Sequence, residues 1–212
     1  MSSKKSPLKS KPAGGDPLEE LLRRYVDDFV AQNQAAHILA EGLKVTGIGF
    51  WSAVDHLTFR TLAIEERAKE FLKFGYAYDS KLGVLEYNNW FAKVYRKPGY
   101  PALFIDQAYP GAKGKGSLIP DWVRAFGDKT LHHCAMRVEE IEQAIFFLEK
   151  QGVRFSGEIV GERGSDLRQI FTEPEMKKGQ AFSVIELTER HRGFMGFSPP
   201  QANRLMESTR VV

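Results

Sequence analysis

A short strand-like pattern that occurs twice constrains this chain more than any other feature. Residues 55–60 read Asp-His-Leu-Thr-Phe-Arg, and residues 132–137 read His-His-Cys-Ala-Met-Arg. Each copy therefore places a histidine, an apolar residue, a small residue, an apolar residue and an arginine in the same order. Side chains alternate between the two faces of a strand. Both copies predict a strand with one apolar face for a core and a second face that carries His56 or His133.

The similarity continues beyond these two strands. Residues 64–74 and 138–151 carry apolar residues at helical spacing, and the two stretches end at Gly75 and Gly152. Glycine is common directly after a helix C-terminus because it adopts the left-handed conformation without strain. Three shorter strand candidates follow each helix, so both halves have the same order of elements.

Each half closes on an apolar strand in which an acid directly follows an isoleucine. These acids are Asp106 in the first half and Glu186 in the second. We therefore divide the chain into two β-α-β-β-β modules, residues 53–107 and residues 129–190. The predicted fold class is α+β, with both modules contributing their sheets to one curled sheet around a metal.

The remaining segments flank or join the modules. Residues 1–16 are rich in Ser, Lys, Pro and Gly. This composition predicts a disordered tail, although a transit peptide is the alternative. The next begins with Asp16 as a helix cap and Pro17 in the first turn, and its leucine-rich stripe predicts a helix that covers the sheet. The expected divisions are a disordered tail at 1–16, an N-terminal helical segment at 17–52, a linker at 108–128, and a C-terminal turn and helix at 191–212.

Composition excludes several classes of function. The net charge is +3, and four lysines within the first eleven residues supply much of it, so the body lacks a nucleic-acid footprint. No apolar run approaches the length of a membrane span. The single cysteine, Cys134, excludes an intrachain disulfide and suits a reducing compartment, so we expect a cytoplasmic protein.

Three residues form a candidate metal centre: His56, His133 and Glu186. Two imidazoles and one carboxylate are the ligand set of non-haem Fe(II) oxygenases, and they leave positions open for a substrate and for O2. A 2-oxo acid can occupy two such positions through its carboxylate and keto oxygens. The same ligands also suit Zn²⁺, Mn²⁺ or Ni²⁺, so the metal stays open at this point.

The other histidines and the second acid have alternative interpretations. Strand alternation places His132 on the apolar face, opposite His133. His37 and His191 are expected at the surface. Asp106 is the expected counterpart of the acid ligand in the other module, and it is either a fourth ligand or a part of the cavity wall.

Arg60 and Arg137 follow the histidines by four residues, so alternation directs them to the cavity face. An inward arginine needs a partner or binds an anion. Arg60 is therefore a candidate for binding the far carboxylate of a substrate. The alternatives are an arginine at the strand end, at the mouth of the barrel, and an ion pair with Asp79 or Glu86.

These residues resemble the vicinal oxygen chelate superfamily. The second module is similar to the catalytic half of 4-hydroxyphenylpyruvate dioxygenase: His133 begins its first strand, and residues 169–174 read Gln-Ile-Phe-Thr-Glu-Pro. The acid ligand of that family and the hydrophobic-x-Gln-Arg ending that follows it are similar to residues 186–190, and a Gly-Phe turn comes next, as at Gly193 and Phe194.

The first module resembles a second family of the same superfamily. Residues 55–61, 92–95 and 101–106 are similar to the 2-oxoadipate dioxygenase/decarboxylase family, and the resemblance extends over residues 17–207. It implies a metal-dependent conversion of 2-oxoadipate to 2-hydroxyglutarate and CO2, a reaction of lysine catabolism. It also implies that Arg60 binds a substrate carboxylate.

Together these patterns predict an Fe(II)-dependent dioxygenase that decarboxylates a 2-oxo acid. Gln169 is expected to donate a hydrogen bond to the substrate or to oxygen. The side chains expected to close the cavity are Phe171, Phe194 and Phe197. Two alternatives remain: a lyase or isomerase that stabilises an enolate on Zn²⁺ or Ni²⁺, and a protein that binds a small molecule without turnover.

Overall fold

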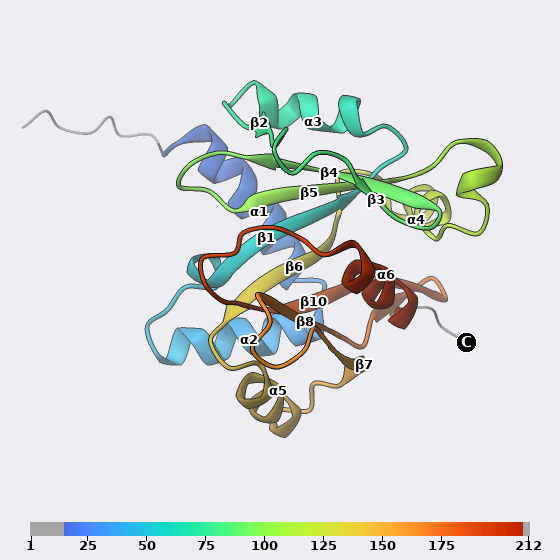
Figure 1. The fold of residues 1–212 in the computed structure, drawn as a ribbon. Coiled ribbons are helices and arrows are strands. Elements are labelled where there is room, and N and C mark those ends of the chain that lie inside the picture. The colour runs from blue at the N-terminus through green and yellow to red at the C-terminus, as the bar shows by residue number, and fades with distance from the viewer. Residues whose placement is uncertain (1–14, 210–212) are drawn as a thin grey trace, which may run out of the picture.

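The chain folds into one curled, open sheet with helices on both of its sides (Figure 1). The structure is a computed structural model and describes residues 15–209, so most of the tail expected at 1–16 lies outside the described residues. In the described range the helices are α1 (Pro17–Val30), α2 (Gln34–Val45), η1 (Phe50–Ala53), α3 (Ile64–Leu72), η2 (Gly111–Gly114), α4 (Ile119–Phe126), α5 (Ile141–Lys150) and α6 (Pro199–Ser208). The strands are β1 (Val54–Arg60), β2 (Ala77–Tyr78), β3 (Leu85–Glu86), β4 (Trp90–Arg96), β5 (Ala102–Ala108), β6 (Leu131–Val138), β7 (Phe155–Val160), β8 (Leu167–Thr172), β9 (Glu175–Lys177) and β10 (Gln180–Arg190).

The sheet is built from two equivalent halves. Its strand order is β2-β4-β5-β1-β6-β10-β8-β7, while β3 pairs with β4 and β9 pairs with β10. In each half the first strand, β1 or β6, is parallel to the last strand, β5 or β10. The halves join where β1 and β6 run antiparallel. This arrangement confirms the predicted α+β class, and it places the two histidine strands side by side at the centre.

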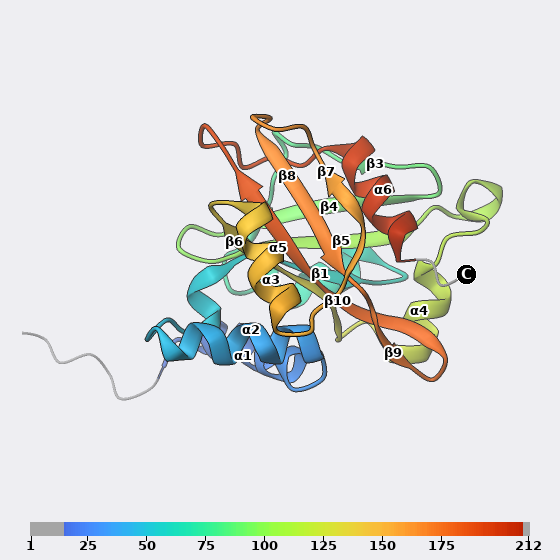
Figure 2. The ribbon, with the colours of Figure 1, turned by 90° about the horizontal axis from the view of Figure 1, so that it is seen from below.

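One face of the central strands forms the main hydrophobic core. Leu57 and Phe59 of β1 are buried there together with Cys134 and Met136 of β6, as alternation predicts. Residues of α1, α3 and α5 complete this core. Figure 2 shows α1, α2 and α5 on one side of the sheet and α6 on the other. The opposite face of the central strands is therefore directed toward α6.

The N-terminal segment expected at 17–52 forms two main helices, where the sequence predicted one helix that covers the sheet. Asp16 caps α1 as predicted, and its carboxylate accepts a hydrogen bond from the Leu18 N–H at 2.9 Å. The helix ends near residue 31, and Asn33 caps α2 by accepting a hydrogen bond from the Ala36 N–H at 2.8 Å. Asparagine is a strong N-cap residue, so a new helix begins here.

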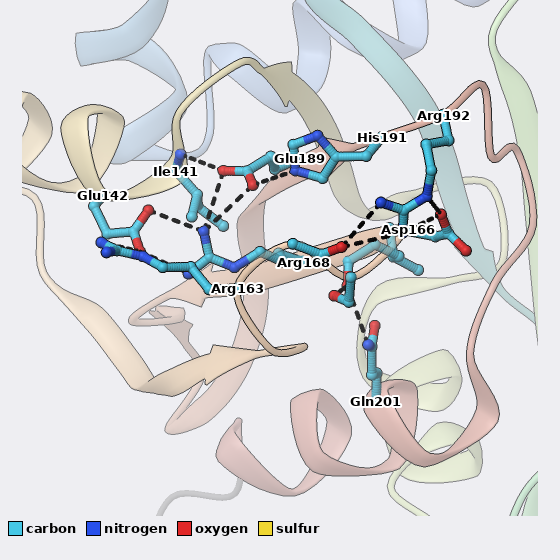
Figure 3. A network of polar contacts seen from close by, with 12 residues as sticks. Ile141, Glu142, Arg163, Asp166, Arg168, Glu189, His191, Arg192 and Gln201 are labelled. Atoms are coloured by element: carbon cyan, nitrogen blue, oxygen red, sulfur yellow. Dashed lines mark hydrogen bonds and ion pairs between the residues drawn. The ribbon is translucent and has the colours of Figure 1, made fainter.

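A buried carboxylate attaches the N-terminus of α5 to the sheet (Figure 3). Glu189 of β10 accepts a hydrogen bond from the Ile141 N–H at 2.7 Å and lies 3.3 Å from Arg168. Arg168 also donates to Glu142 at 2.7 Å. His191 was expected to be an ordinary surface residue, but it is half-buried and its Nε2 lies 2.6 Å from Glu189.

In the described part of the chain, every helix is too short or too polar to cross a membrane.

Candidate metal centre

The register of the three central strands brings His56 and Glu186 to the same level of the sheet. His56 of β1 and Glu186 of β10 both pair with Ala135 of β6, which lies between them. His133 precedes Ala135 by two residues and therefore shares its face. The methyl group of Ala135 occupies little volume, so the side chains of its neighbours can converge above it.

The ligand atoms of the three predicted residues converge. Among the described residues, His56, His133 and Glu186 form a buried cluster in which one ligand atom from each lies within 4.8 Å of the others. Glu186 Oε2 is 3.5 Å from His56 Nε2 and 3.1 Å from His133 Nε2. Two imidazole nitrogens and one carboxylate oxygen around a common point suit a divalent metal ion, and a three-residue set leaves coordination positions free.

Asp55 and Arg190 hold His56 in a fixed orientation. His56 Nδ1 lies 2.8 Å from Asp55 Oδ2, so this nitrogen carries the proton and Nε2 is free as a ligand. Arg190 donates two hydrogen bonds to the Asp55 carboxylate, at 2.8 and 2.9 Å. Burial raises the pKa of Asp55, but His56 and Arg190 outweigh this effect and hold the pKa below its ordinary value. A carboxylate behind a ligating histidine fixes the ring and increases its basicity.

The role of Asp55 was missed in the sequence, and the reason is local. Neighbouring residues of a regular strand point to opposite faces, so Asp55 was not expected beside His56. The pairing of β1 with β6 shifts between Val54 and His56, and Asp55 is the additional residue of that irregularity. The Asp-His pair itself was the only signal in the sequence.

The two carboxylate oxygens of Glu186 make different contacts. Oε1 accepts a hydrogen bond from Thr188 Oγ1 at 2.7 Å and another from Gln169 Nε2, while Oε2 faces both histidines. Burial raises the pKa of Glu186, but His56 and His133 outweigh it and hold the pKa well below its ordinary value. The carboxylate is therefore ionised and oriented before any metal binds. Gln169, expected to contact substrate or oxygen, positions the acid in this structure.

The expected orientation of His132 is wrong, because β6 is bulged at this point. Thr58 pairs with His133 and the next residue of β1 pairs with Leu131, which leaves His132 as an additional residue. His132 and His133 consequently both line the same cavity, and their Nδ1 atoms lie 2.9 Å apart. His132 is not part of the three-residue ligand cluster. Burial and the charge of Arg60 hold its pKa well below the ordinary value, so it is neutral.

A mostly apolar cavity lies above the cluster, between the sheet and α6. Phe171 and Phe197 line it as predicted, and His56 contacts the Phe197 ring edge-on with centroids 5.0 Å apart. Phe194, predicted to close the cavity, is not among its lining residues, and neither is Arg137, which is exposed. The other lining residues include Trp90, Phe104, Leu205 and Met206.

Asp106 is not the counterpart of Glu186, contrary to the prediction from the repeat. The parallel pairs align His56 with Ala102 and His133 with Val184. Two residues further along the last strands, Phe104 therefore corresponds to Glu186. Asp106 pairs with Arg60. It lies two residues beyond Phe104 on β5, about 7 Å further along the strand. Phe104 provides an apolar wall where a fourth ligand would otherwise stand.

Arg60 is buried and lines the cavity as predicted. Its Nε is 3.8 Å from Asp106 Oδ2, and its Nη2 donates to the Met206 sulfur at 2.9 Å. The alternative pairing with Asp79 is wrong, because Asp79 accepts a hydrogen bond from Arg96 at 2.8 Å. Burial lowers the pKa of Arg60 to about 10, so the guanidinium is still charged at neutral pH.

Comparisons with known proteins identify the fold. No family model and no curated protein matches the sequence. The solved hydroxyglutarate synthase of Oryza sativa, in complex with 2-oxoadipate, is similar with a TM-score of 0.67 and 17% identity over 99% of this chain and 97% of that chain. A Shewanella frigidimarina protein provisionally named a hydrolase gives a TM-score of 0.71 at 17% identity, over 86% of this chain and 98% of its own.

A third similar structure is a Ralstonia eutropha protein assigned to the glyoxalase superfamily. Its TM-score is 0.63 at 12% identity, over 84% of both chains. At such low identities the likeness establishes the fold alone. The chain has the fold of the vicinal oxygen chelate type, and its central strands carry a His-His-Glu cluster that suits a metal ion.

Proposed function

We propose that this protein is an Fe(II)-dependent dioxygenase that oxidatively decarboxylates a 2-oxo acid. The observation that carries the proposal is the buried convergence of His56, His133 and Glu186 beneath a largely apolar cavity. These three residues would hold the metal ion. Bound Fe(II) would supply the activation of O2 and a chelation site for the 2-oxo acid head group.

The other residues would orient the reactants and exclude water. Phe104, Phe171 and Phe197 surround the ligand cluster with apolar surface, which keeps the reacting groups away from bulk water. Gln169 donates one N–H to Glu186, and its second N–H is free to donate to the substrate. The histidine ligand His56 is fixed by a neighbouring carboxylate before the substrate arrives.

We further propose a substrate with a second acidic group, with 2-oxoadipate as the best candidate. The metal would fix the 2-oxo acid end, which is identical in all such acids, so discrimination falls to the far end of the cavity. Arg60 is placed there, four residues along β1 from His56, a distance of about 13 Å between their Cα atoms. The similar rice enzyme was solved with 2-oxoadipate, which supports the choice. The reaction would give 2-hydroxyglutarate and CO2.

Oxygen consumption tests this proposal directly. Protein loaded anaerobically with Fe(II) is mixed with a panel of 2-oxo acids, and O2 uptake and CO2 release are recorded. We expect both with 2-oxoadipate, and we expect Glu186→Ala to abolish both. Arg60→Ala should lower turnover of the dicarboxylic substrate on the order of 100-fold without changing metal content. A preference for 4-hydroxyphenylpyruvate would overturn the dicarboxylate assignment.

The same experiment separates the alternatives. Turnover supported by Zn²⁺ or Ni²⁺ without O2 would identify a lyase or isomerase on the same ligand set. Tight binding of a 2-oxo acid without turnover under any metal would identify a binding protein.

A further inference from the structure

The cavity has a second polar end, remote from the metal cluster. Arg60 of β1 and Asp106 of β5 are paired in register, and each is only 2% exposed. Two of their buried polar atoms lack a hydrogen-bond partner in the described chain: Arg60 Nε and Asp106 Oδ1. The Nε to Oδ2 distance is 3.8 Å, so the two groups attract each other without a hydrogen bond. Buried polar atoms without partners are uncommon and call for an explanation.

The surroundings supply no better partner. Nη2 of Arg60 donates to the Met206 thioether, which is a weak acceptor, and the guanidinium lies over the Trp122 ring. Three ionisable groups interact with the pair. Burial raises the pKa of Tyr87 and the charge of Asp106 adds to that effect, while the charge of Arg60 contributes to the lowered pKa values of His132 and His133. On α4, Asp121 and Arg124 pair with each other at the surface.

The charges of the pair decide what can bind there. Arg60 and an ionised Asp106 sum to zero, so an added carboxylate would be a buried charge without compensation, which is costly. The unpartnered atoms instead offer one donor, Arg60 Nε–H, and one acceptor, Asp106 Oδ1. A neutral group that both accepts and donates satisfies both atoms at once.

We propose that the far end of the cavity binds either a primary amide, which donates to Asp106, or a carboxyl group that shares one proton with Asp106, and that in both cases the bound group accepts a hydrogen bond from Arg60. A primary amide offers both the acceptor and the donor by itself. The far carboxylate of a dicarboxylic 2-oxo acid binds only when one proton lies between it and the Asp106 carboxylate. The inference rests on the 2-oxo acid function proposed above, and it specifies which substrates that site favours and at which pH.

The proton is available near neutral pH. Burial raises the pKa of Asp106 to about 7, against the opposing charge of Arg60. Below this pKa the protonated Asp106 donates to a substrate carboxylate that also accepts from Arg60. Above it, Asp106 is ionised and repels the same carboxylate. Dicarboxylate binding is therefore present below about pH 7 and is lost as the pH rises through that value.

Calorimetry on protein loaded with Mn²⁺ under anaerobic conditions tests the inference, because binding is measured without turnover. The three ligands are 2-oxoadipate, its 6-monoamide and 2-oxohexanoate, each titrated at pH 6 and pH 8.5. Dividing each affinity by that of 2-oxohexanoate removes the pH dependence of the metal site. We expect the 2-oxoadipate ratio to fall about 30-fold between the two pH values, from the Asp106 pKa of about 7. The amide ratio should stay constant.

Two variants complete the experiment. Asp106→Asn should make the 2-oxoadipate ratio independent of pH and raise it at pH 8.5, which loss of a purely structural residue would not do. Asp79→Asn removes a similar Asp–Arg pair outside the cavity and should behave as wild type. At pH 7, where free Asp106 is about half ionised, titration in two buffers of different ionisation enthalpy should report proton uptake when 2-oxoadipate binds, and this uptake should be absent in Asp106→Asn.

The outcomes distinguish this inference from the proposed function. If all three ligands bind and the 2-oxoadipate ratio is the same at both pH values in wild type and Asp106→Asn, the inference is wrong and the 2-oxo acid function stands. If none of the three binds to metal-loaded protein, the 2-oxo acid function fails, and the inference that rests on it fails with it.

Discussion

At the scale of single residues, Asp55 does the most to prepare the proposed metal centre. It holds His56 Nδ1 and is itself held by two hydrogen bonds from Arg190. We predict that Asp55→Asn weakens metal binding 10–100-fold, because the amide cannot support the imidazole as a carboxylate does. The measurement is a competition titration with a chelator of known affinity.

The matched control for this prediction is Asp79→Asn. Asp79 also pairs with an arginine, Arg96, but lies outside the cavity, so its replacement should leave the metal affinity unchanged. Equal affinities of wild type and Asp55→Asn would mean that packing alone orients His56.

Single residues also mark the limit of prediction from this sequence. The repeat pointed to His56 and His133 because matched strands impose matched positions, and the structure brings both residues close to Glu186. The repeat gave the wrong orientation for His132, and it wrongly predicted Asp106 as the counterpart of Glu186. Strand alternation holds only while the pairing is regular, and a β-bulge is a property of two strands together. The bulge in β6 and the two-residue offset of Asp106 depend on partners that are distant in sequence.

At the scale of elements, one buried residue connects α2 to β10, the strand that carries Glu186. Asn33 caps α2 through Oδ1, and its Nδ2 donates to Ser183 of β10 at 3.0 Å. We predict that Asn33→Ala lowers the free energy of unfolding by about 2–3 kcal/mol, from a lost cap and an unsatisfied buried hydroxyl. Urea denaturation of the metal-free protein measures the change.

Asn33→Asp serves as the comparison for that variant. Aspartate keeps the capping oxygen and can accept a hydrogen bond from the Ser183 hydroxyl, so it should lose less stability than alanine does. Equal losses for both substitutions would show that the amide group itself is required.

The helices were more predictable than the connections between them. Apolar spacing and capping residues identified α1, α3, α5 and α6, since these signals are local in sequence. The division between α1 and α2 depends on the burial of Asn33 against β10, which the N-terminal segment alone does not reveal. Contacts of this kind form only once the whole sheet is assembled.

At the scale of the whole molecule, stability should decline in acid. Burial raises the pKa of Glu189, but the Ile141 N–H, His191 and Arg168 outweigh it and the pKa is lowered. The hydrogen bond from Arg168 lowers the pKa of Glu142 to about 2. Groups with a lowered folded pKa stabilise the protein above their unfolded pKa of 4.5, and this contribution is lost as the pH falls toward 2.

We therefore predict a Tm of the metal-free protein that falls steadily between pH 4.5 and about 2. Glu189→Gln should have a lower Tm than wild type at pH 7, and the difference should shrink as the pH falls, because wild type then loses the same charge. Replacement of the exposed Glu158 by Gln is the control, with no change expected. A difference that stays constant down to pH 2.5 would contradict the role assigned to the Glu189 charge.

Metal binding should stabilise the entire fold, because the three proposed ligands come from strands of both halves of the sheet. His56 lies on β1 of the first half, while His133 and Glu186 lie on β6 and β10 of the second. An ion that binds only the folded state adds about 4 kcal/mol at a thousandfold excess over its Kd. For a chain of this size we predict a rise in Tm of about 8–16 °C with Mn²⁺ or anaerobic Fe(II), reversed by a chelator. Glu186→Gln should remove the rise, whereas replacement of the exposed His37 by Ala should preserve it. A full rise in Glu186→Gln would place the metal elsewhere and would remove the basis for the proposed dioxygenase.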